Sequence, residues 1–186
     1  MKKASSGIRK DILIFAGPAI FIFMTVVILP FLYGIYLTFT DWNGVASVKN
    51  MVGMENYVTA FKDKQFWASI WLTLKYVFGT AILVNTVAFF LAYLLTRAIK
   101  GRNFLRAGFF IPNLIGGIVL GYIWKFIFSR ALVSIGTKFG ISLFSSSWLT
   151  DPATAFWSLI IVSVWQYAGY MMLIYIAGFM SVPQDI

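Results

Sequence analysis

One short run in the sequence combines an amide with aromatic side chains inside an apolar stretch. Gln166 directly follows Trp165 and precedes Tyr170 by four residues. Residues four apart share a helix face, whereas Trp165 would lie about 100° around the helix from Gln166. An amide exchanges hydrogen bonds with hydroxyls, and aromatic rings cover apolar surface. These residue types suit a sugar ring, which has an apolar face and a hydroxyl edge, but Trp and Tyr also serve in helix packing.

Two further amides, Asn85 and Asn113, lie within other apolar stretches. The hydrocarbon core of a membrane offers them no partner, so each must face protein or a water-filled cavity. At about 1.5 Å of rise per residue, Gln166 lies about 20 Å into its stretch, near the bilayer midplane, where transporter sites lie. We predict a polar substrate passage lined by Gln166, Tyr170, Trp165, Asn113 and Asn85. The alternative for each amide is a hydrogen bond between helices.

Small residues in the third apolar stretch indicate close helix packing. Gly117 and Gly121 have the small-x-x-x-small spacing that lets the backbones of two membrane helices approach each other. We therefore predict that these two glycines face another helix.

The composition excludes several kinds of chemistry. The chain has no Cys and no His, which removes most metal sites, His-dependent triads and histidine proton relays. No apolar stretch contains Asp or Glu, so a di-aspartyl intramembrane enzyme and a carboxylate proton relay are also excluded. The sequence lacks a Gly-x-x-x-x-Gly-Lys-Ser/Thr phosphate loop. We expect no catalytic residue, metal or cofactor, and no enzymatic activity in this chain.

Four apolar stretches must position these residues. A helix needs about 20 apolar residues to cross the hydrocarbon core, and 60% of this chain is hydrophobic, against about 45–50% in soluble domains. The sequence predicts an all-α membrane protein with four transmembrane helices, at residues 12–39, 70–96, 104–128 and 153–180. The segments between and around them are 1–11, an outer loop with a short interfacial helix at 40–69, an inner loop at 97–103, an outer loop at 129–152, and 181–186.

Local signals refine these boundaries. The apolar spacing within residues 53–61 predicts the short surface helix. Asp151 before Pro152 predicts the start of the last helix, since Asp caps a helix and Pro is tolerated at its first position. Pro18, Pro30 and Pro112 lie inside predicted spans, where each removes a backbone donor and disturbs the preceding turn. We expect kinks at these prolines.

Basic residues lie beside the ends of the apolar stretches and determine the predicted orientation. The net charge is +9, but the cations form no aromatic-interleaved stripe of the kind that binds nucleic acid. By the positive-inside rule, the flanks rich in Lys and Arg lie in the cytoplasm and the loops of mixed charge lie outside. The amino terminus and the 97–103 loop are therefore predicted to be cytoplasmic, on the evidence of Lys2, Lys3, Arg9, Lys10, Arg97, Lys100, Arg102 and Arg106.

Several motifs follow one another in a recognisable order. They are Gly53-Met-Glu-Asn-Tyr57, Phe66-Trp67, Lys100-Gly-Arg102-Asn-Phe104-Leu-Arg106, Trp148-Leu-Thr-Asp-Pro152 and Val182-Pro183-Gln-Asp-Ile186. In this order and spacing they resemble the carbohydrate-uptake permease subunits of bacterial ABC importers, in the branch of the maltose and glycerol-phosphate systems. The resemblance extends over nearly the whole chain.

The resemblance implies a type I importer permease of six spans in the bacterial cell membrane, in which helix bundles rock around a central site. Its expected partners are a second permease subunit, two ATP-binding cassette ATPase subunits and an extracytoplasmic sugar-binding protein. A coupling loop and two more spans would be expected to follow, so the sequence looks like the amino-terminal part of such a permease, with the coupling region starting at 181–186. The competing hypothesis is a small membrane scaffold that only binds other helices.

Overall fold

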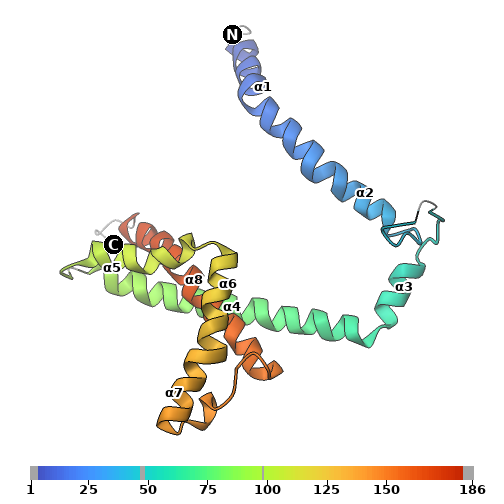
Figure 1. Cartoon of the computed structure of the whole chain (residues 1–186). Coiled ribbons are helices and arrows are strands. Elements are labelled where there is room, and N and C mark those ends of the chain that lie inside the picture. The colour runs from blue at the N-terminus through green and yellow to red at the C-terminus, as the bar shows by residue number, and fades with distance from the viewer. Residues whose placement is uncertain (1–3, 47–48, 98, 182–186) are drawn as a thin grey trace. The chain divides into compact units, whose positions relative to one another are not determined.

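In the computed structural model the chain is built from helices (Figure 1). The structure describes residues 4–46, 49–97 and 99–181, and for residues 4–13 the backbone alone. Within these ranges there is no strand, only an isolated antiparallel bridge between Thr40 and Met51. The α-helices are α1 (Ala4–Phe23), α2 (Leu29–Leu37), α3 (Glu55–Lys62), α4 (Lys64–Thr96), α5 (Arg102–Phe110), α6 (Gly117–Phe126), α7 (Leu132–Phe139) and α8 (Pro152–Ser181).

Four helical segments are long and apolar enough to cross a membrane. They are Ile14–Leu37, Lys64–Thr96, Gly117–Phe139 and Pro152–Ser181. The predicted fold class, an all-α membrane protein with four transmembrane helices, is confirmed. The chain divides into two compact units, Met1–Ser69 and Ile70–Ile186. The predicted motif at Val182–Ile186 lies outside the described residues.

The first unit contains one long helical segment interrupted by a wider turn. A π-helical turn at Met24–Ile28 separates α1 from α2, and the Leu29 N–H bonds to the Met24 carbonyl five residues back. Pro30 follows directly, and its ring would clash with the preceding turn of a regular α-helix. The wider turn accommodates the proline. Within its own unit no residue of Ile14–Leu37 is buried, so its apolar side chains are available to lipid or to other helices.

The loop between α2 and α3 is held by local hydrogen bonds. The Asp41 carboxylate accepts hydrogen bonds from the Asn50 side chain and from the Asn50 backbone N–H, each at 2.8 Å. These bonds hold the pKa of the Asp41 carboxyl below its ordinary value. The Asn56 amide at the start of α3 donates to the carbonyl oxygens of Thr38 (2.9 Å) and Thr40 (2.8 Å). α3 is thus fixed to the end of α2, and it includes most of the region 53–61 where a short helix was expected.

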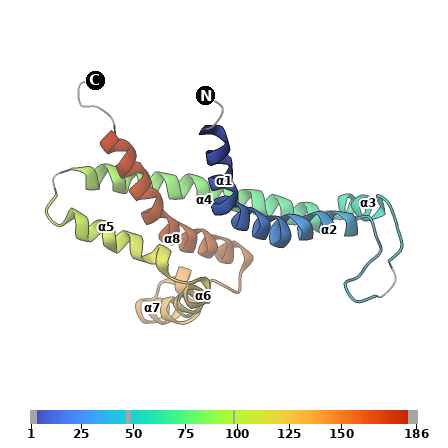
Figure 2. The same ribbon diagram turned by 90° about the horizontal axis from the view of Figure 1, so that it is seen from above.

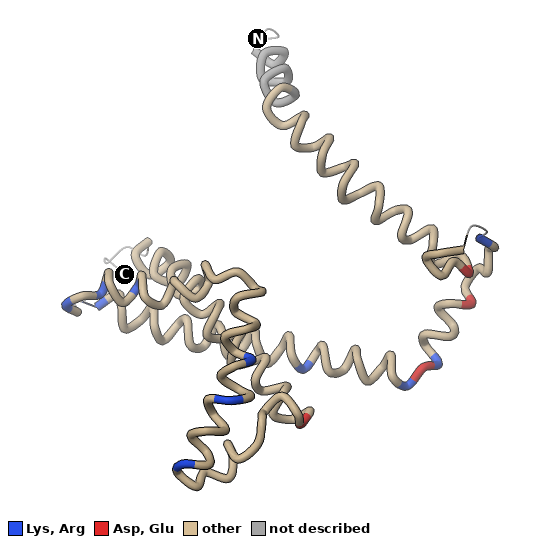
Figure 3. The backbone as a smooth tube through the Cα atoms, viewed as in Figure 1, with Lys and Arg blue, Asp and Glu red and all other residues tan. Residues whose placement is uncertain are grey.

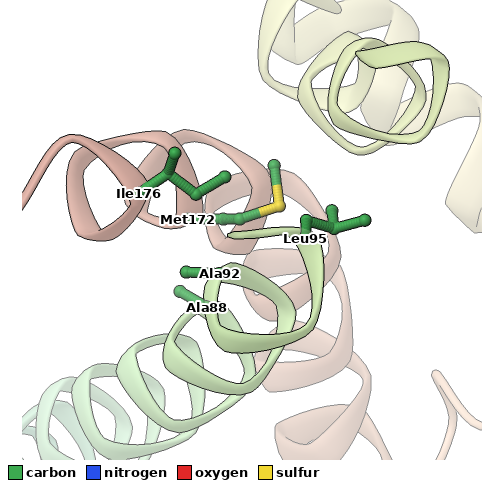
Figure 4. Packing of buried hydrophobic residues seen from close by; sticks show 5 residues of the cluster. All are labelled: Ala88, Ala92, Leu95, Met172 and Ile176. Carbon is green, nitrogen blue, oxygen red and sulfur yellow. The ribbon is translucent and has the colours of Figure 1, made fainter. Parts of the chain in front are cut away.

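The second unit is organised around α4 and α8, which cross in both views (Figures 1 and 2). Small residues at the crossing let the two backbones approach, as in other membrane helix pairs. Ala88 and Ala92 of α4 are fully buried against Met172 and Ile176 of α8, and Leu95 closes the cluster (Figure 4). Lipid is as apolar as these side chains, so close van der Waals packing stabilises the contact rather than hydrophobic burial.

The third apolar stretch differs from the single span expected at residues 104–128. It forms α5, a 3-10 turn at Ile111–Leu114, and then a new helix that begins at Gly117. Pro112 lacks the donor that would continue α5, and Gly116 is extended (φ −61°, ψ 142°). The chain therefore breaks where a kink was expected. The segment of spanning length is Gly117–Phe139, formed by α6, a π turn at Ile127–Ala131 and α7.

The start of α8 follows the predicted capping pattern. Asp151 Oδ1 accepts hydrogen bonds from the backbone N–H groups of Ala153 (2.8 Å) and Thr154 (3.2 Å), and Pro152 is the first helical residue. These contacts satisfy two of the free donors at the helix amino terminus. The predicted helix start is confirmed.

Candidate functional site

Two cavities without a shared lining residue lie against α8. The first, which we call the tyrosine cavity, lies between α4 and α8, has a volume of about 450 Å³ and includes Tyr76, Tyr167 and Tyr170 in its wall. The second, the α5 groove, lies between α4, α5, the 3-10 turn and α8 and has a volume of about 370 Å³. Both volumes fall within the range of about 300–1,000 Å³ that small-molecule sites occupy. Their walls differ in chemistry.

The polar groups around the tyrosine cavity bridge α4 and α8. Asn85 Oδ1 accepts a hydrogen bond from the Tyr175 hydroxyl at 2.7 Å, and its Nδ2 donates to the Ala81 carbonyl at 2.7 Å. The Tyr76 hydroxyl lies 2.7 Å from Ser163 Oγ, which itself donates to the Leu159 carbonyl. Asn85 therefore makes a hydrogen bond between helices, which was the alternative given for each amide in the sequence. It also lines the cavity.

One hydroxyl in this wall lacks a partner. Thr86 and Thr96 of α4 each donate to the carbonyl four residues earlier, which is the usual arrangement for Thr in a helix. Thr80 Oγ1 is buried and makes no hydrogen bond to any described residue. An unpaired buried hydroxyl costs about 1–3 kcal/mol, so Thr80 marks a place where water or a ligand hydroxyl would be favourable.

The structure brings only some of the predicted passage residues together. Tyr170 is 47% exposed and lines the same cavity as Asn85. Gln166 is partly buried one turn before Tyr170 on the same helix face and makes no hydrogen bond to a described residue. Asn113 is partly buried in the 3-10 turn, also without such a bond, and it lines neither cavity.

Trp165 lies on the other side of α8. Its ring packs edge to face against Trp124 of α6, with the ring centroids 5.4 Å apart, and it lines the α5 groove. Trp124 in turn stacks on Phe128 at 5.1 Å. The rotation of about 100° between consecutive helical residues thus separates Trp165 from the Tyr170 side. Trp165 holds α6 against α8.

Among the described glycines, Gly169 has the tightest surroundings, and not the two glycines singled out in the sequence. A Cβ atom at Gly169 would collide with the backbone carbonyl of Phe109, where α5 meets α8. Gly117 and Gly121 have no atom of the described chain within 4 Å of an added Cβ. Any helix that packs on these two glycines is therefore not among the contacts of the described chain. Gly169 has no small residue four positions away, so the spacing rule could not identify it.

Sequence reasoning also missed Thr80, Tyr76 and Tyr167 in the wall of the tyrosine cavity. A usable signal was present for two of them. Tyr76 and Thr80 are four residues apart and share one face of α4. Asn85 lies five residues after Thr80, about 140° around the helix, so the sequence could have paired Tyr76 with Thr80 but not with Asn85.

A chain of four spanning helices joined by short segments, with cavities between the helices, is a multi-pass integral membrane protein. None of the family models compared matches the sequence. The chain is 42% identical over 173 residues to the protein named "Probable starch degradation products transport system permease protein AmyD" of Thermoanaerobacterium thermosulfurigenes, with 93% of this chain and 59% of AmyD covered. It is 29% identical over 157 residues to the multiple sugar-binding transport system permease protein MsmF of Streptococcus mutans, with 84% and 54% covered.

A solved structure shares the fold of this chain. It is the crystal structure of a bacterial ABC transporter involved in the import of the acidic polysaccharide alginate, with a TM-score of 0.73, 23% identity, and 98% of this chain and 62% of that chain covered. This chain is therefore a homologue of the permease subunits of carbohydrate-type ABC importers, and the resemblance found in the sequence is confirmed. The chain spans about 60% of the length of these relatives.

Proposed function

We propose that this chain is part of the permease subunit of an ATP-driven, binding-protein-dependent sugar importer. The observation that carries the proposal is the 42% identity over 93% of the chain with a permease named for the transport of starch degradation products. The chemistry of the chain supports it, because the described spans contain no carboxylate that could run a proton relay. Energy would come from ATPase partners.

The proposed transport step is alternating access around a site beside α8. The tyrosine cavity supplies aromatic walls from Tyr167 and Tyr170 and a free hydroxyl at Thr80. Gln166 adds an amide without a hydrogen-bond partner among the described residues, one turn from Tyr170. These groups match the hydroxyl edge and apolar face of a sugar. Asn85 completes the lining of this cavity, and Trp165 supports it by packing α6 onto α8. Asn113 lines neither cavity and stays a proposed passage residue on its residue type and depth alone.

The proposed partners are a second permease subunit, two ATP-binding cassette ATPases and an extracytoplasmic sugar-binding protein. Gly117 and Gly121 on the exposed face of α6 are proposed to pack against a helix of the second permease subunit, because the described chain leaves that face open. The sequence has no phosphate loop for ATP, which supports ATPases as separate subunits.

Sugar uptake by the native host tests the proposal. Deletion of the gene that carries this chain is expected to abolish uptake of one sugar class from a radiolabelled panel of monosaccharides, disaccharides and starch-derived oligosaccharides. The intact gene should restore it, and amino-acid uptake should not change. Unchanged uptake of every sugar would contradict the proposal and favour a scaffold role.

The proposed orientation has its own test. The chain has no native Cys, so single cysteines can be placed at the exposed positions Ser146 and Gly101. In intact cells, Ser146→Cys should react with a membrane-impermeant thiol reagent, whereas Gly101→Cys should react only after the cells are opened. The reverse pattern would place the amino terminus outside and overturn the orientation.

A further inference from the structure

The turn between α4 and α5, together with the first two turns of α5, carries four cations within ten positions: Arg97, Lys100, Arg102 and Arg106 (Figure 3). We call these residues the basic turn. The sequence has no Asp or Glu between Gln65 and Thr150, so the helices that meet at this turn supply no carboxylate to balance it. A positive-inside bias explains why cations lie here, but not how they are arranged.

The four cations have different roles. Arg106 is partly buried, and its Nη2 donates to the Leu95 carbonyl at 2.6 Å, in the last turn of α4. A cation at this end of a helix is favoured by the helix dipole, so Arg106 fixes α5 to α4. Lys100 and Arg102 are exposed and make no hydrogen bond to a described residue. Arg97 is also exposed and lies over the Tyr93 ring, 4.4 Å from its centroid.

The α5 groove begins directly beside the basic turn. Phe104 and Leu105, in the first turn of α5, line one end of it, and the lining continues through Gly108 and Phe109 to Pro112. The groove wall has no charged, hydroxyl or amide side chain, and its one indole belongs to Trp165. Phe104 is 83% exposed, so its ring is available to cover an apolar chain. Cations above an apolar groove match a molecule with an anionic head and a hydrocarbon tail.

We propose that the basic turn and the α5 groove together bind one anionic phospholipid. Arg97, Lys100 and Arg102 hold its phosphate and headgroup, and one acyl chain lies in the α5 groove beside Phe104 and Gly108. Arg106 is a positioning residue that keeps the turn in place. Basic clusters beside membrane helices on the cytoplasmic side attract anionic lipids, and a free phosphate would leave the groove without an occupant. The proposal does not depend on which sugar is carried.

Native mass spectrometry of the full chain in a neutral detergent tests this site. We expect phosphatidylglycerol to bind with a stoichiometry of one and more tightly than phosphatidylcholine. Each cation near an anionic lipid contributes roughly a fivefold factor in affinity, so the variant Arg97→Gln/Lys100→Gln/Arg102→Gln should bind phosphatidylglycerol on the order of a hundredfold more weakly. A matched control, Lys62→Gln/Lys64→Gln/Lys138→Gln, removes the same charge from exposed positions elsewhere and should bind normally.

A second variant tests the contact with the acyl chain separately from the contact with the lipid headgroup. No atom of the described chain lies within 4 Å of a Cβ added at Gly108, so Gly108→Leu should fill the groove without unfolding α5. It should weaken phosphatidylglycerol binding while every cation remains, with an unchanged melting temperature. Equal loss in the control variant, equal binding of phosphatidylcholine, or full competition by inorganic phosphate would overturn the proposal. Unaltered binding by Gly108→Leu would show that something other than lipid covers the groove.

Discussion

The two sides of α8 face different surroundings although the helix is apolar along its length. Toward the tyrosine cavity, α8 and α4 share the hydrogen bonds Tyr175–Asn85 and Tyr76–Ser163, and Thr80 remains unpaired. Toward the α5 groove, α8 meets α5 through backbone contact at Gly169, and it meets α6 through the ring contact of Trp165 with Trp124. The α4 side combines these polar pairs with the close packing of Ala88 and Ala92 on Met172, whereas the wall of the α5 groove has no hydroxyl or amide side chain. Hydroxyl and amide groups that can exchange hydrogen bonds with a solute line the tyrosine cavity.

The contacts on the two sides of α8 differ in how easily they can rearrange. A hydrogen bond between membrane helices contributes little, about 0.6 kcal/mol on average, so polar residues between α4 and α8 can change partners at low cost. A backbone-to-backbone contact cannot adjust in this way, because its fit depends on the absence of a side chain. We infer that the α5 side is the rigid support and that the α4 side is where binding occurs.

The largest effect on stability is expected at the α5 side. Gly169→Ala adds a methyl group that collides with the Phe109 carbonyl, and overpacking of this kind costs about 1–3 kcal/mol. The melting temperature of the purified protein should fall. Gly178→Ala on the same helix is the control, since an added Cβ there meets nothing within 4 Å, and it should be neutral or slightly stabilising. Equal melting temperatures would show that α5 does not rest on α8.

A smaller change of opposite sign is expected at Thr80. Thr80→Val removes a buried hydroxyl that has no hydrogen-bond partner among the described residues, so the protein should gain up to about 1 kcal/mol of stability. If the hydroxyl serves a bound sugar, uptake should fall at the same time. Thr86→Val is the comparison, because the Thr86 hydroxyl already bonds to the Ile82 carbonyl. Lower stability of Thr80→Val would indicate that the hydroxyl has a partner after all.

Deleting the Tyr175–Asn85 hydrogen bond between α8 and α4 should change the stability by less than the Thr80 substitution does. Tyr175→Phe deletes the donor to Asn85 and keeps the ring contact with Phe89, whose centroid lies 5.8 Å away. A loss of about 0.6 kcal/mol is expected. A double-mutant cycle with Asn85→Leu isolates this coupling from the loss of ring packing. A coupling of several kcal/mol would contradict the description of this side as adjustable.

The smallest effect on the chain itself is expected at the face of α6 that carries Gly117 and Gly121, because no described atom packs on it. Gly121→Ala should leave the melting temperature of this chain unchanged, because the added methyl group has open space. It should instead weaken co-purification of the second permease subunit if that subunit packs on this face. A lower melting temperature with normal co-purification would contradict the proposed role of Gly117 and Gly121.

The sequence predicted the elements better than their contacts. The length of the apolar stretches identified four spanning segments, because the thickness of the hydrocarbon core sets the minimum length of every spanning helix. It could not place the break at Pro112 and Gly116, since the same residues also fit a kinked helix. The start of α8 was predictable because Asp151 and Pro152 act locally.

The candidate site was predictable in part. Residue type and depth selected Asn85, Gln166 and Tyr170, but only the paired geometry of α4 and α8 places Asn85 and Tyr170 at one cavity. Trp165 was grouped with them by proximity in sequence, and helix rotation places it in the α5 groove. Gly169 had no sequence signal because its neighbour, the Phe109 carbonyl, is far away in the chain.

The central claim, that sugar passes on the Tyr170 side of α8, is tested most directly by uptake in two adjacent variants of the assembled permease. Gln166→Leu removes an amide on that side at little cost in volume, and Trp165→Phe retains an aromatic ring on the other side. A substrate left with unpaired hydroxyls loses about 1–3 kcal/mol, roughly tenfold or more in rate. Gln166→Leu should therefore lose uptake at normal protein abundance, while Trp165→Phe retains it. Normal uptake by Gln166→Leu together with loss in Trp165→Phe would contradict the claim.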